Sequence, residues 1–165
     1  MTNEDTKKYV LSILVDNEPG VLSRISGLFS GRGFNIESLC VAETTDPNIS
    51  RITLVTVGDT FIVEQIKKQL NKVINVIKVT DFTGIPFVQR EMALVQIRAK
   101  PEHRPEILRI VDIFRSRVID VGSEYYIVEV TGDEDKLNAF LSLLKPMGIK
   151  EIARTGAIAL TREKK

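Results

Sequence analysis

The fold is decided by the first long apolar stretch of the chain, Tyr9–Phe29, which reads YVLSILVDNEPGVLSRISGLF. Its first seven residues place apolar side chains on both sides of an extended chain, which predicts a strand. The turn-forming run Asp16–Gly20 interrupts this pattern, and apolar residues then recur at the three-to-four spacing of an amphipathic helix. Gly31 and Gly33 follow, and glycine commonly ends a helix. The stretch therefore predicts a strand, a short connection and a helix.

The residues that follow predict two more strands, a second helix and a last strand. The strands Phe34–Ala42 and Ile52–Val57 are separated by the turn-rich segment Glu43–Asn48, so we expect a hairpin with a long loop. Asp59 is a natural N-cap for the second helix, and Val76–Val79 has the composition of a strand. The order is strand, helix, strand, strand, helix, strand, which is that of the ferredoxin-like fold.

The same order recurs in the second half of the chain. The apolar spacing of the first helix reappears about 85 residues later, and the Gly58-Asp59 start of the second helix reappears as Gly132-Asp133. The offset between these two Gly-Asp pairs is smaller than the offset between the first helices, which indicates a tighter hairpin in the second copy. We therefore predict an α+β protein of two ferredoxin-like β-α-β-β-α-β domains in tandem, with domains at 1–81 and 90–165 and a linker at 82–89.

The predicted sheets have an apolar face that their own helices do not cover. A ferredoxin-like domain carries both helices on one face of its sheet, yet Val10, Leu14, Val55 and Val57 point to the other face. We expect this face to pair with another copy of the domain, within the chain or across a dimer.

The composition argues against several functional classes. Lys and Arg total 23 against 22 Asp and Glu, so the net charge of +1 gives no strong field for a nucleic acid. One cysteine, Cys40, and one histidine, His103, allow neither an internal disulfide nor a zinc site. No apolar run approaches the roughly 18 residues of a membrane span, and the polar N-terminus does not resemble a signal peptide. We expect a cytoplasmic protein that binds neither nucleic acid nor membrane.

Candidate catalytic and metal-binding residues are few. His103 stands in a polar loop without a second imidazole to share proton transfer, and Cys40 lies between apolar residues of a predicted strand. Gly31-Arg32-Gly33 follows a helix, so the amides of a helix N-terminus do not point at it. The strand Arg51–Val57 has no aromatic side chain on which an RNA base could stack. We therefore predict no catalytic residue and no metal site.

The strand-to-helix connection Asp16–Leu22 is the segment that a scaffold alone does not explain. A helix N-terminus bears unpaired N–H groups and partial positive charge, so it can hold a small carboxylate, and Gly20 would allow close approach. Asn17 offers an amide donor and a carbonyl acceptor, which suits a ligand with both carboxylate and ammonium groups. An ordinary turn with Pro19 in its first positions explains the same residues, and the local pattern alone favours that interpretation.

The second copy of the repeat provides an internal control. At the 85-residue offset Asn17 becomes Glu102 and Gly20 becomes Pro105, so the second connection loses the adaptable amide and the bare backbone. We therefore expect a division of labour in which the first domain senses a ligand and the second docks to a partner.

Two runs of sequence resemble the small regulatory subunit of acetolactate synthase, also called acetohydroxyacid synthase. They are Asp16–Arg24 and Leu28–Leu39, of which Asn17–Leu22 alone indicates only an ACT domain, the β-α-β-β-α-β amino-acid sensor. The resemblance covers nearly the whole chain. The other segments that fit the family are Arg51–Thr53, Gln65–Leu70, Val88–Glu91, Ile113–Arg115, Ile119–Val121 and Ala153–Gly156.

This resemblance implies a non-catalytic subunit. It would bind and activate a separate catalytic subunit and confer feedback inhibition by valine in branched-chain amino-acid biosynthesis. Thiamine diphosphate, FAD and magnesium would be held by that catalytic partner, which condenses two pyruvates or pyruvate with 2-oxobutyrate, and this chain would hold no cofactor. A free-standing ACT-type sensor of another enzyme or of a transcription factor remains an alternative, although the chain has no helix-turn-helix segment. A small enzyme active without a partner is a further alternative.

The resemblance also implies an effector site between two ACT domains of a homodimer. In it, amides around Gly20 would take the carboxylate of valine, Asn17 and Asn35 would orient its polar groups, and apolar neighbours would accept its isopropyl group. The positions that match the family's effector residues are Asn17, Gly20, Val21, Leu22, Asn35, Ile36 and Ala42.

Overall fold

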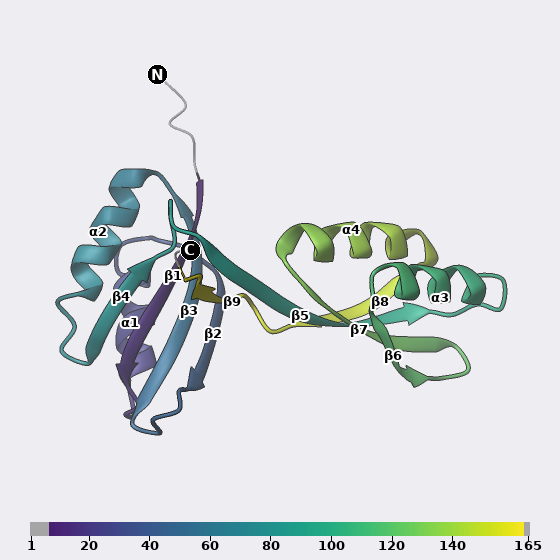
Figure 1. The fold of residues 1–165 in the computed structure, drawn as a ribbon, viewed down its shortest axis with the longest axis horizontal. Coiled ribbons are helices and arrows are strands. Elements are labelled where there is room, and N and C mark those ends of the chain that lie inside the picture. The colour runs from purple at the N-terminus through teal and green to yellow at the C-terminus, as the bar shows by residue number, and fades with distance from the viewer. Residues whose placement is uncertain (1–6, 164–165) are drawn as a thin grey trace, which may run out of the picture. The chain divides into compact units, whose positions relative to one another are not determined.

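The structure, a computed structural model, describes residues 7–163 and divides into two compact units (Figure 1). The first unit consists of the chain up to Val88 together with the segment from Ala157 on, and the second of Gln89–Gly156. Each unit contains two helices and four antiparallel strands in the order strand, helix, strand, strand, helix, strand, and a fifth strand, described below, adds to the second sheet. The predicted tandem α+β architecture is confirmed.

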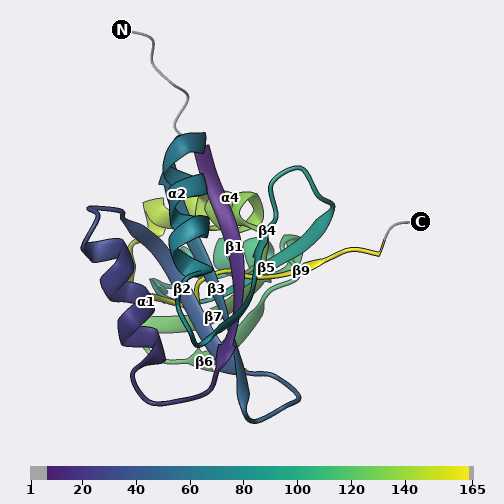
Figure 2. The same cartoon turned by 90° about the vertical axis from the view of Figure 1, so that its left-hand side faces the viewer.

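The first unit holds its sheet strands in the order β2-β3-β1-β4, and Figure 2 shows its two helices over one face of the sheet. The predicted hairpin with a long loop is present, because residues 44–48 connect β2 to β3. Its elements are β1 (Lys7–Asp16), α1 (Val21–Ser30), β2 (Ile36–Glu43), β3 (Ile49–Gly58), α2 (Thr60–Leu70) and β4 (Val76–Asp81).

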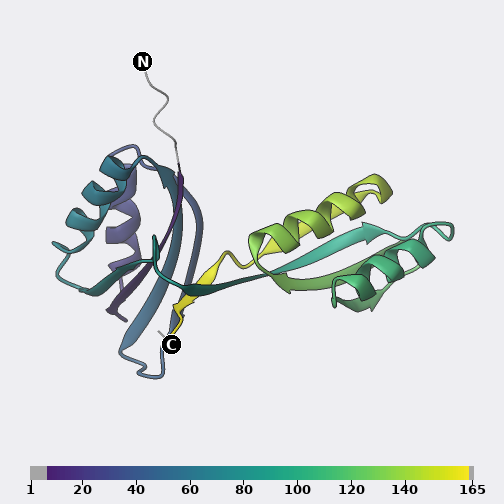
Figure 3. The same cartoon turned by 45° about the horizontal axis from the view of Figure 1, so that its top comes forward.

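The second unit repeats this arrangement, with the strand order β6-β7-β5-β8 and both helices on one face of the sheet (Figure 3). The hairpin between β6 and β7 is tighter than its counterpart, and the Gly122 N–H donates to the Tyr125 carbonyl across it at 2.9 Å. The elements are β5 (Phe87–Arg98), α3 (Arg104–Ile113), β6 (Arg117–Val121), β7 (Tyr125–Gly132), α4 (Glu134–Leu144), a short 3-10 helix (Lys145–Met147) and β8 (Ile149–Arg154).

Matching aspartates start the second helix of each unit. The Asp59 carboxylate accepts from the Ile62 N–H at 2.7 Å, and the Asp133 carboxylate accepts from the Lys136 N–H at 2.9 Å. Each bond satisfies a backbone donor that the helix itself leaves free. The predicted cap at Asp59 is confirmed, and Asp133 shows that the repeat extends to this detail.

Each unit has its own hydrophobic core between its sheet and its helices. In the first, Leu11 and Ile13 of β1 pack with Ile25 and Phe29 of α1 and with Ile66 of α2. In the second unit, side chains of the central strands β5 and β7 pack with those of α3 and α4. Burying these apolar side chains is the main favourable term for each unit.

The last strand, β9 (Ile158–Thr161), packs with the first unit although we placed it in a domain at 90–165. It pairs with β5, and Ala157 and Ala159 pack with Phe82 against Val10 and Val55 on the face of the sheet that the helices leave open. The physical reason is the apolar character of this face, which the chain covers with its own last residues.

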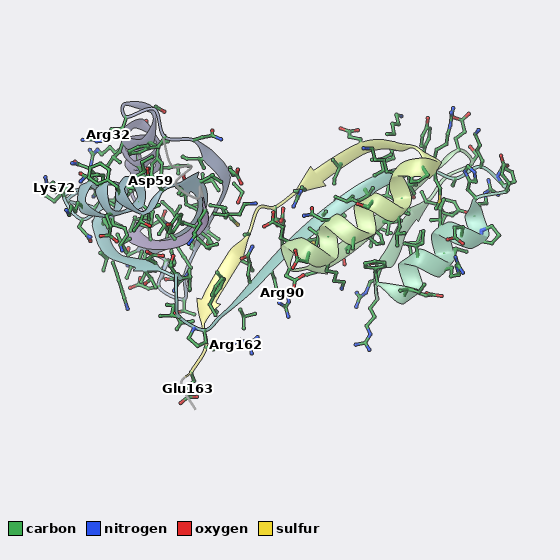
Figure 4. All side chains as sticks on the ribbon, turned by 90° about the horizontal axis from the view of Figure 1, so that it is seen from above. Arg32, Asp59, Lys72, Arg90, Arg162 and Glu163 are labelled. Carbon is green, nitrogen blue, oxygen red and sulfur yellow. The ribbon has the colours of Figure 1, made fainter. Side chains whose placement is uncertain are left out.

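The return of β9 is also fixed by the backbone around it. Gly156 precedes it with a φ of 81°, a conformation that favours glycine. Arg162 lies just beyond the strand (Figure 4), and its N–H donates to the Pro86 carbonyl at 2.9 Å. The first unit therefore includes the segment from Ala157 to Glu163, and part of the open face needs no second copy to cover it.

Candidate functional site

The site predicted from the sequence lies where β1 leads into α1. Gly20 is the N-cap of α1, with φ 85° and ψ −9°, and its position offers no side chain to cap the helix. A Cβ added at Gly20 would meet no atom within 4 Å, so the backbone conformation, rather than lack of space, is what requires glycine.

Two of the first amides of α1, those of Leu22 and Ser23, have no acceptor among the described residues. The Arg24 N–H donates to the Gly20 carbonyl at 3.0 Å, and the Val21 N–H makes a long bond of 3.4 Å to the Glu18 carbonyl. Within residues 7–163, the N–H groups of Leu22 and Ser23 have no hydrogen-bond acceptor, and the first turn contains no acidic residue. This helix end can therefore accept an anionic group from outside.

Asn17 is held by the connection between β2 and β3. Its side-chain amide donates to the Pro47 carbonyl at 2.9 Å and to the Glu43 carboxylate at 3.3 Å, and its backbone N–H donates to the Asn48 carbonyl at 2.8 Å. We expected the side chain to offer a ligand both a donor and an acceptor. In this arrangement its donors are engaged, and its carbonyl oxygen is the group left for a ligand.

The other predicted site residues divide between the two ends of the sheet. Ala42 is exposed and adjoins Glu43, so it lies at the end of β2 that contacts Asn17. Asn35 and Ile36 lie at the start of β2, where Ile36 pairs with Thr56 and the Thr56 hydroxyl donates to the Asn35 carbonyl.

The two groups are separated by most of the length of β3. Asp16, where the connection begins, pairs with Ile49, whereas Ile36 pairs with Thr56. At about 3.3 Å per residue these ends lie about 20 Å apart. One chain therefore does not bring Asn35 and Ile36 to the Gly20 connection.

The side chains of Val21 and Leu22 differ in what they can offer a ligand. Val21 is buried in the core, so it can contribute only its backbone amide, whereas Leu22 is 42% exposed. The connection thus combines free amides, one exposed apolar side chain and the carbonyl oxygen of Asn17, which are groups suited to a small apolar molecule with a carboxylate.

Asn75 also belongs to this connection, and the sequence analysis missed it. It lies in the turn between α2 and β4, is 7% exposed, and its amide donates to the carboxylates of Asp16 at 3.2 Å and Glu18 at 3.3 Å. Its carbonyl oxygen accepts from the Arg24 guanidinium. The signal available in the sequence was a single amide side chain inside the apolar run Val73–Val76, because a buried polar group needs partners.

The corresponding connection of the second unit is bridged by the Arg104 side chain and borders a cavity of about 280 Å³ lined by Arg98–Pro101, Ser123 and Glu124. The Arg104 guanidinium donates to the carbonyls of Ala99 at 3.0 Å and Ser123 at 2.9 Å and lies over the Tyr126 ring. The N-cap, His103, has an ordinary right-handed backbone, and Pro105 occupies the first turn. This connection presents no counterpart of the open helix end at Gly20.

The remaining chemistry of the described chain is limited. In residues 7–163, no three His, Cys, Asp or Glu side chains gather closely enough to hold a metal ion. Cys40 is half-buried in β2, and the Nδ1 atom of His103 is buried without a hydrogen-bond partner. No helix within these residues has the length and apolar character needed to cross a membrane.

Comparison with known proteins identifies the family. A family model described as an AHAS small subunit-like ACT domain matches residues 11–78, and one described as the small subunit of acetolactate synthase matches residues 90–163. The acetolactate synthase small subunit of Aquifex aeolicus is 49% identical, over 95% of this chain and 82% of its own length. A probable acetolactate synthase small subunit of Archaeoglobus fulgidus is 51% identical, over 96% of this chain and 99% of its own length.

A solved structure agrees with these relatives. The crystal structure of the acetolactate synthase small subunit from Thermotoga maritima matches with a TM-score of 0.88 at 42% identity, and the match covers 96% of this chain and 99% of that chain. The resemblance drawn from the motifs is thereby confirmed, and the chain belongs to the family of acetolactate synthase small subunits.

Proposed function

We propose that this chain is a regulatory subunit that binds and activates the catalytic subunit of acetolactate synthase and makes it sensitive to inhibition by valine. Its relatives carry the name of the small subunit of that enzyme, which supports a regulatory and non-catalytic role. The observation that carries the proposal for the effector is the open N-terminus of α1 at Gly20, with free amides at Leu22 and Ser23.

The effector is bound through complementary chemistry. Its carboxylate accepts from the amides at the start of α1, where the helix dipole favours negative charge. Its ammonium group donates to the carbonyl oxygen of Asn17, and its branched side chain packs near Leu22. These contacts favour a small apolar amino acid over a basic one.

The complete site needs two copies of the chain. Asn35 and Ile36 lie about 20 Å from the Gly20 connection of their own chain, so a second copy supplies them in a homodimer. An effector bound between two copies binds one dimer arrangement more tightly than others and shifts the population toward it. A coupling of about 1 to 3 kcal/mol is typical of such regulation.

The second unit is the proposed surface for the catalytic subunit, because its own strand-to-helix connection lacks the left-handed glycine N-cap of the first. Thiamine diphosphate, FAD and magnesium belong to that partner in this proposal, and this chain contributes no group to the chemical step.

The test is reconstitution of the full chain with its catalytic subunit. Acetolactate formation is measured for the catalytic subunit alone, with this chain, and with this chain plus L-valine, D-valine or L-lysine. Higher activity with the chain and inhibition by L-valine alone are the expected results. Unchanged catalytic activity would refute the proposal and favour a free-standing sensor of another protein.

A further inference from the structure

Asn75 joins three charged side chains around the connection between β1 and α1. It lies in the turn before β4, and its neighbours in sequence, Val73, Ile74 and Val76, are apolar. With 7% of its surface exposed, it nonetheless has hydrogen-bond partners for both its amide nitrogen and its carbonyl oxygen. A buried amide that is satisfied in this way fixes the groups it contacts.

The backbone reinforces this contact. The N–H of Asp16 donates to the main-chain carbonyl of Asn75 at 2.9 Å. The turn before β4 is therefore attached to the end of β1 through both the main chain and the side chain of Asn75. The carboxylates of Asp16 and Glu18 receive the two N–H groups of one amide, at 3.2 and 3.3 Å.

The two carboxylates would otherwise compete for the start of α1. Asp16 and Glu18 precede the N-cap Gly20 by four and two residues, and carboxylates near a helix N-terminus are attracted to its free amides. The N–H groups of Leu22 and Ser23 are free of acceptors within residues 7–163 although both carboxylates are close in sequence. A carboxylate that bound them would occupy the place of a ligand's own carboxylate.

We propose that Asn75 is a positioning residue that holds the carboxylates of Asp16 and Glu18 away from the first amides of α1 and so leaves this helix end free for an amino-acid effector. The Arg24 guanidinium, which donates to the same Asn75 side chain, keeps the amide oriented with its N–H groups toward the carboxylates. This inference rests on the proposed effector site.

The test measures L-valine binding to the full chain by calorimetry. The side chain in Asn75→Ser is too short to bridge both carboxylates. We expect L-valine binding to weaken about fivefold, which is the upper end of the usual effect of a carboxylate at a helix N-terminus. Adding Asp16→Asn and Glu18→Gln to this variant removes the competing charges and is expected to restore binding. A purely structural role of Asn75 would not be rescued by neutralising its partners.

Two further variants keep the test decisive. Asn71→Ser is the matched control, because Asn71 lies in the same turn and donates only to the Lys67 carbonyl, so its binding should equal that of the wild type. If Asn75→Ser does not fold, Asn75→Gln keeps a neutral amide, and its additional methylene moves the donors out of place for both carboxylates. Thermal melting establishes that each variant is folded.

The outcomes separate this inference from the proposed function. A wild-type chain that binds no L-valine refutes the effector site itself. A wild-type chain that binds, with Asn75→Ser binding equally well, overturns the role of Asn75 and leaves the effector site standing. Weakened binding that the charge-neutral variant does not restore also overturns it.

Discussion

The two units share one fold, but their first strand-to-helix connections differ. In the first unit, Gly20 adopts a left-handed backbone and the N–H groups of Leu22 and Ser23 have no acceptor among the described residues, whereas in the second the Arg104 guanidinium bridges the connection by donating to two carbonyls. The apolar register of α3 matches that of α1 at the 85-residue offset, yet α3 begins at Arg104, two residues ahead of that register. The first connection therefore presents free helix amides, and the second is bridged by its own arginine.

The units also differ in how they treat the sheet face opposite the helices. In the first unit Ala157, Ala159 and Phe82 cover part of this face, while in the second Met92 and Leu94 are 36% and 41% exposed. The exposed face agrees with a docking role for the second unit, because exposed apolar side chains on a sheet need a partner to cover them.

A substitution at Gly20 should have the largest effect on the difference between the two connections. Gly20→Asp is expected to abolish inhibition by L-valine, because the new carboxylate takes the place of the carboxylate of the ligand. The loss corresponds to the whole coupling free energy of about 1 to 3 kcal/mol. Activation of the catalytic subunit should persist. The measurement is acetolactate synthase activity against L-valine concentration.

Gly20→Asn is the matched control for that variant. Asparagine tolerates the left-handed conformation at φ 85° about as well as aspartate does, and it adds no charge. Weaker but measurable inhibition in Gly20→Asn, against none in Gly20→Asp, would assign the effect to charge. Equal loss in both variants would instead assign it to the backbone, and full valine sensitivity in Gly20→Asp would contradict the site.

The covered face of the first unit is tested at β9. Ala159 is 3% exposed and its neighbour Ile158 is 53% exposed, so Ala159→Asp buries an unpaired charge and Ile158→Asp does not. We expect Ala159→Asp to lower the free energy of unfolding by about 3 kcal/mol and Ile158→Asp to change it little. Denaturant unfolding measures both, and equal effects would mean that β9 does not cover the first unit.

The contacts of β9 also affect any test of effector binding that uses a fragment of the first unit. A fragment of residues 1–81 lacks Phe82, Ala157 and Ala159, so it would leave Val10 and Val55 without their cover. A test of effector binding by the first unit alone therefore needs β9 restored by a linker.

The repeat, its element order and the Asp59 cap could all be predicted from the sequence, because they depend on local periodicity and on residues a few positions apart. The fold of β9 back onto the first unit could not, since Ile158–Thr161 is short and its partners, Val10 and Val55, are distant in sequence. The role of Asn75 was missed for the same reason. Its contacts to Asp16 and Glu18 span most of the first unit.

In each unit an ion pair also anchors the last strand of the β-α-β-β-α-β repeat, and the carboxylates of the two pairs differ in burial. In the second unit, the Arg154 guanidinium donates to both oxygens of Glu91, which is 8% exposed, at 2.7 and 2.9 Å. The hydrogen bond that Arg154 donates to the Glu91 carboxylate raises the pKa of Arg154. Arg154→Met leaves the Glu91 carboxylate buried without its partner and should cost about 2 kcal/mol of unfolding free energy.

Arg162→Met is a control for the loss of an arginine, since its guanidinium makes one long bond of 3.3 Å to the Phe87 carbonyl. Arg162→Met is expected to lower the free energy of unfolding by only about 0.5 kcal/mol. If Arg154→Met and Arg162→Met unfold at the same denaturant concentration, the buried pair does not stabilise the second unit.

In the corresponding pair of the first unit, Lys67 with Asp81, the carboxylate is more exposed than that of Glu91, so this pair should give the smallest effect. Burial raises the pKa of Asp81, but hydrogen bonds from Thr83 and from Lys67 outweigh it, so its pKa lies below 3.8. A carboxyl group with a lowered pKa in the folded state stabilises the fold above the pKa of the unfolded chain, and this contribution is lost as the pH falls through the folded value. Asp81→Asn should therefore cost about 0.5 kcal/mol at pH 7 and nothing at pH 2, when compared by denaturant unfolding. A cost that stays the same at both pH values would show that Asp81 acts through its shape rather than its charge.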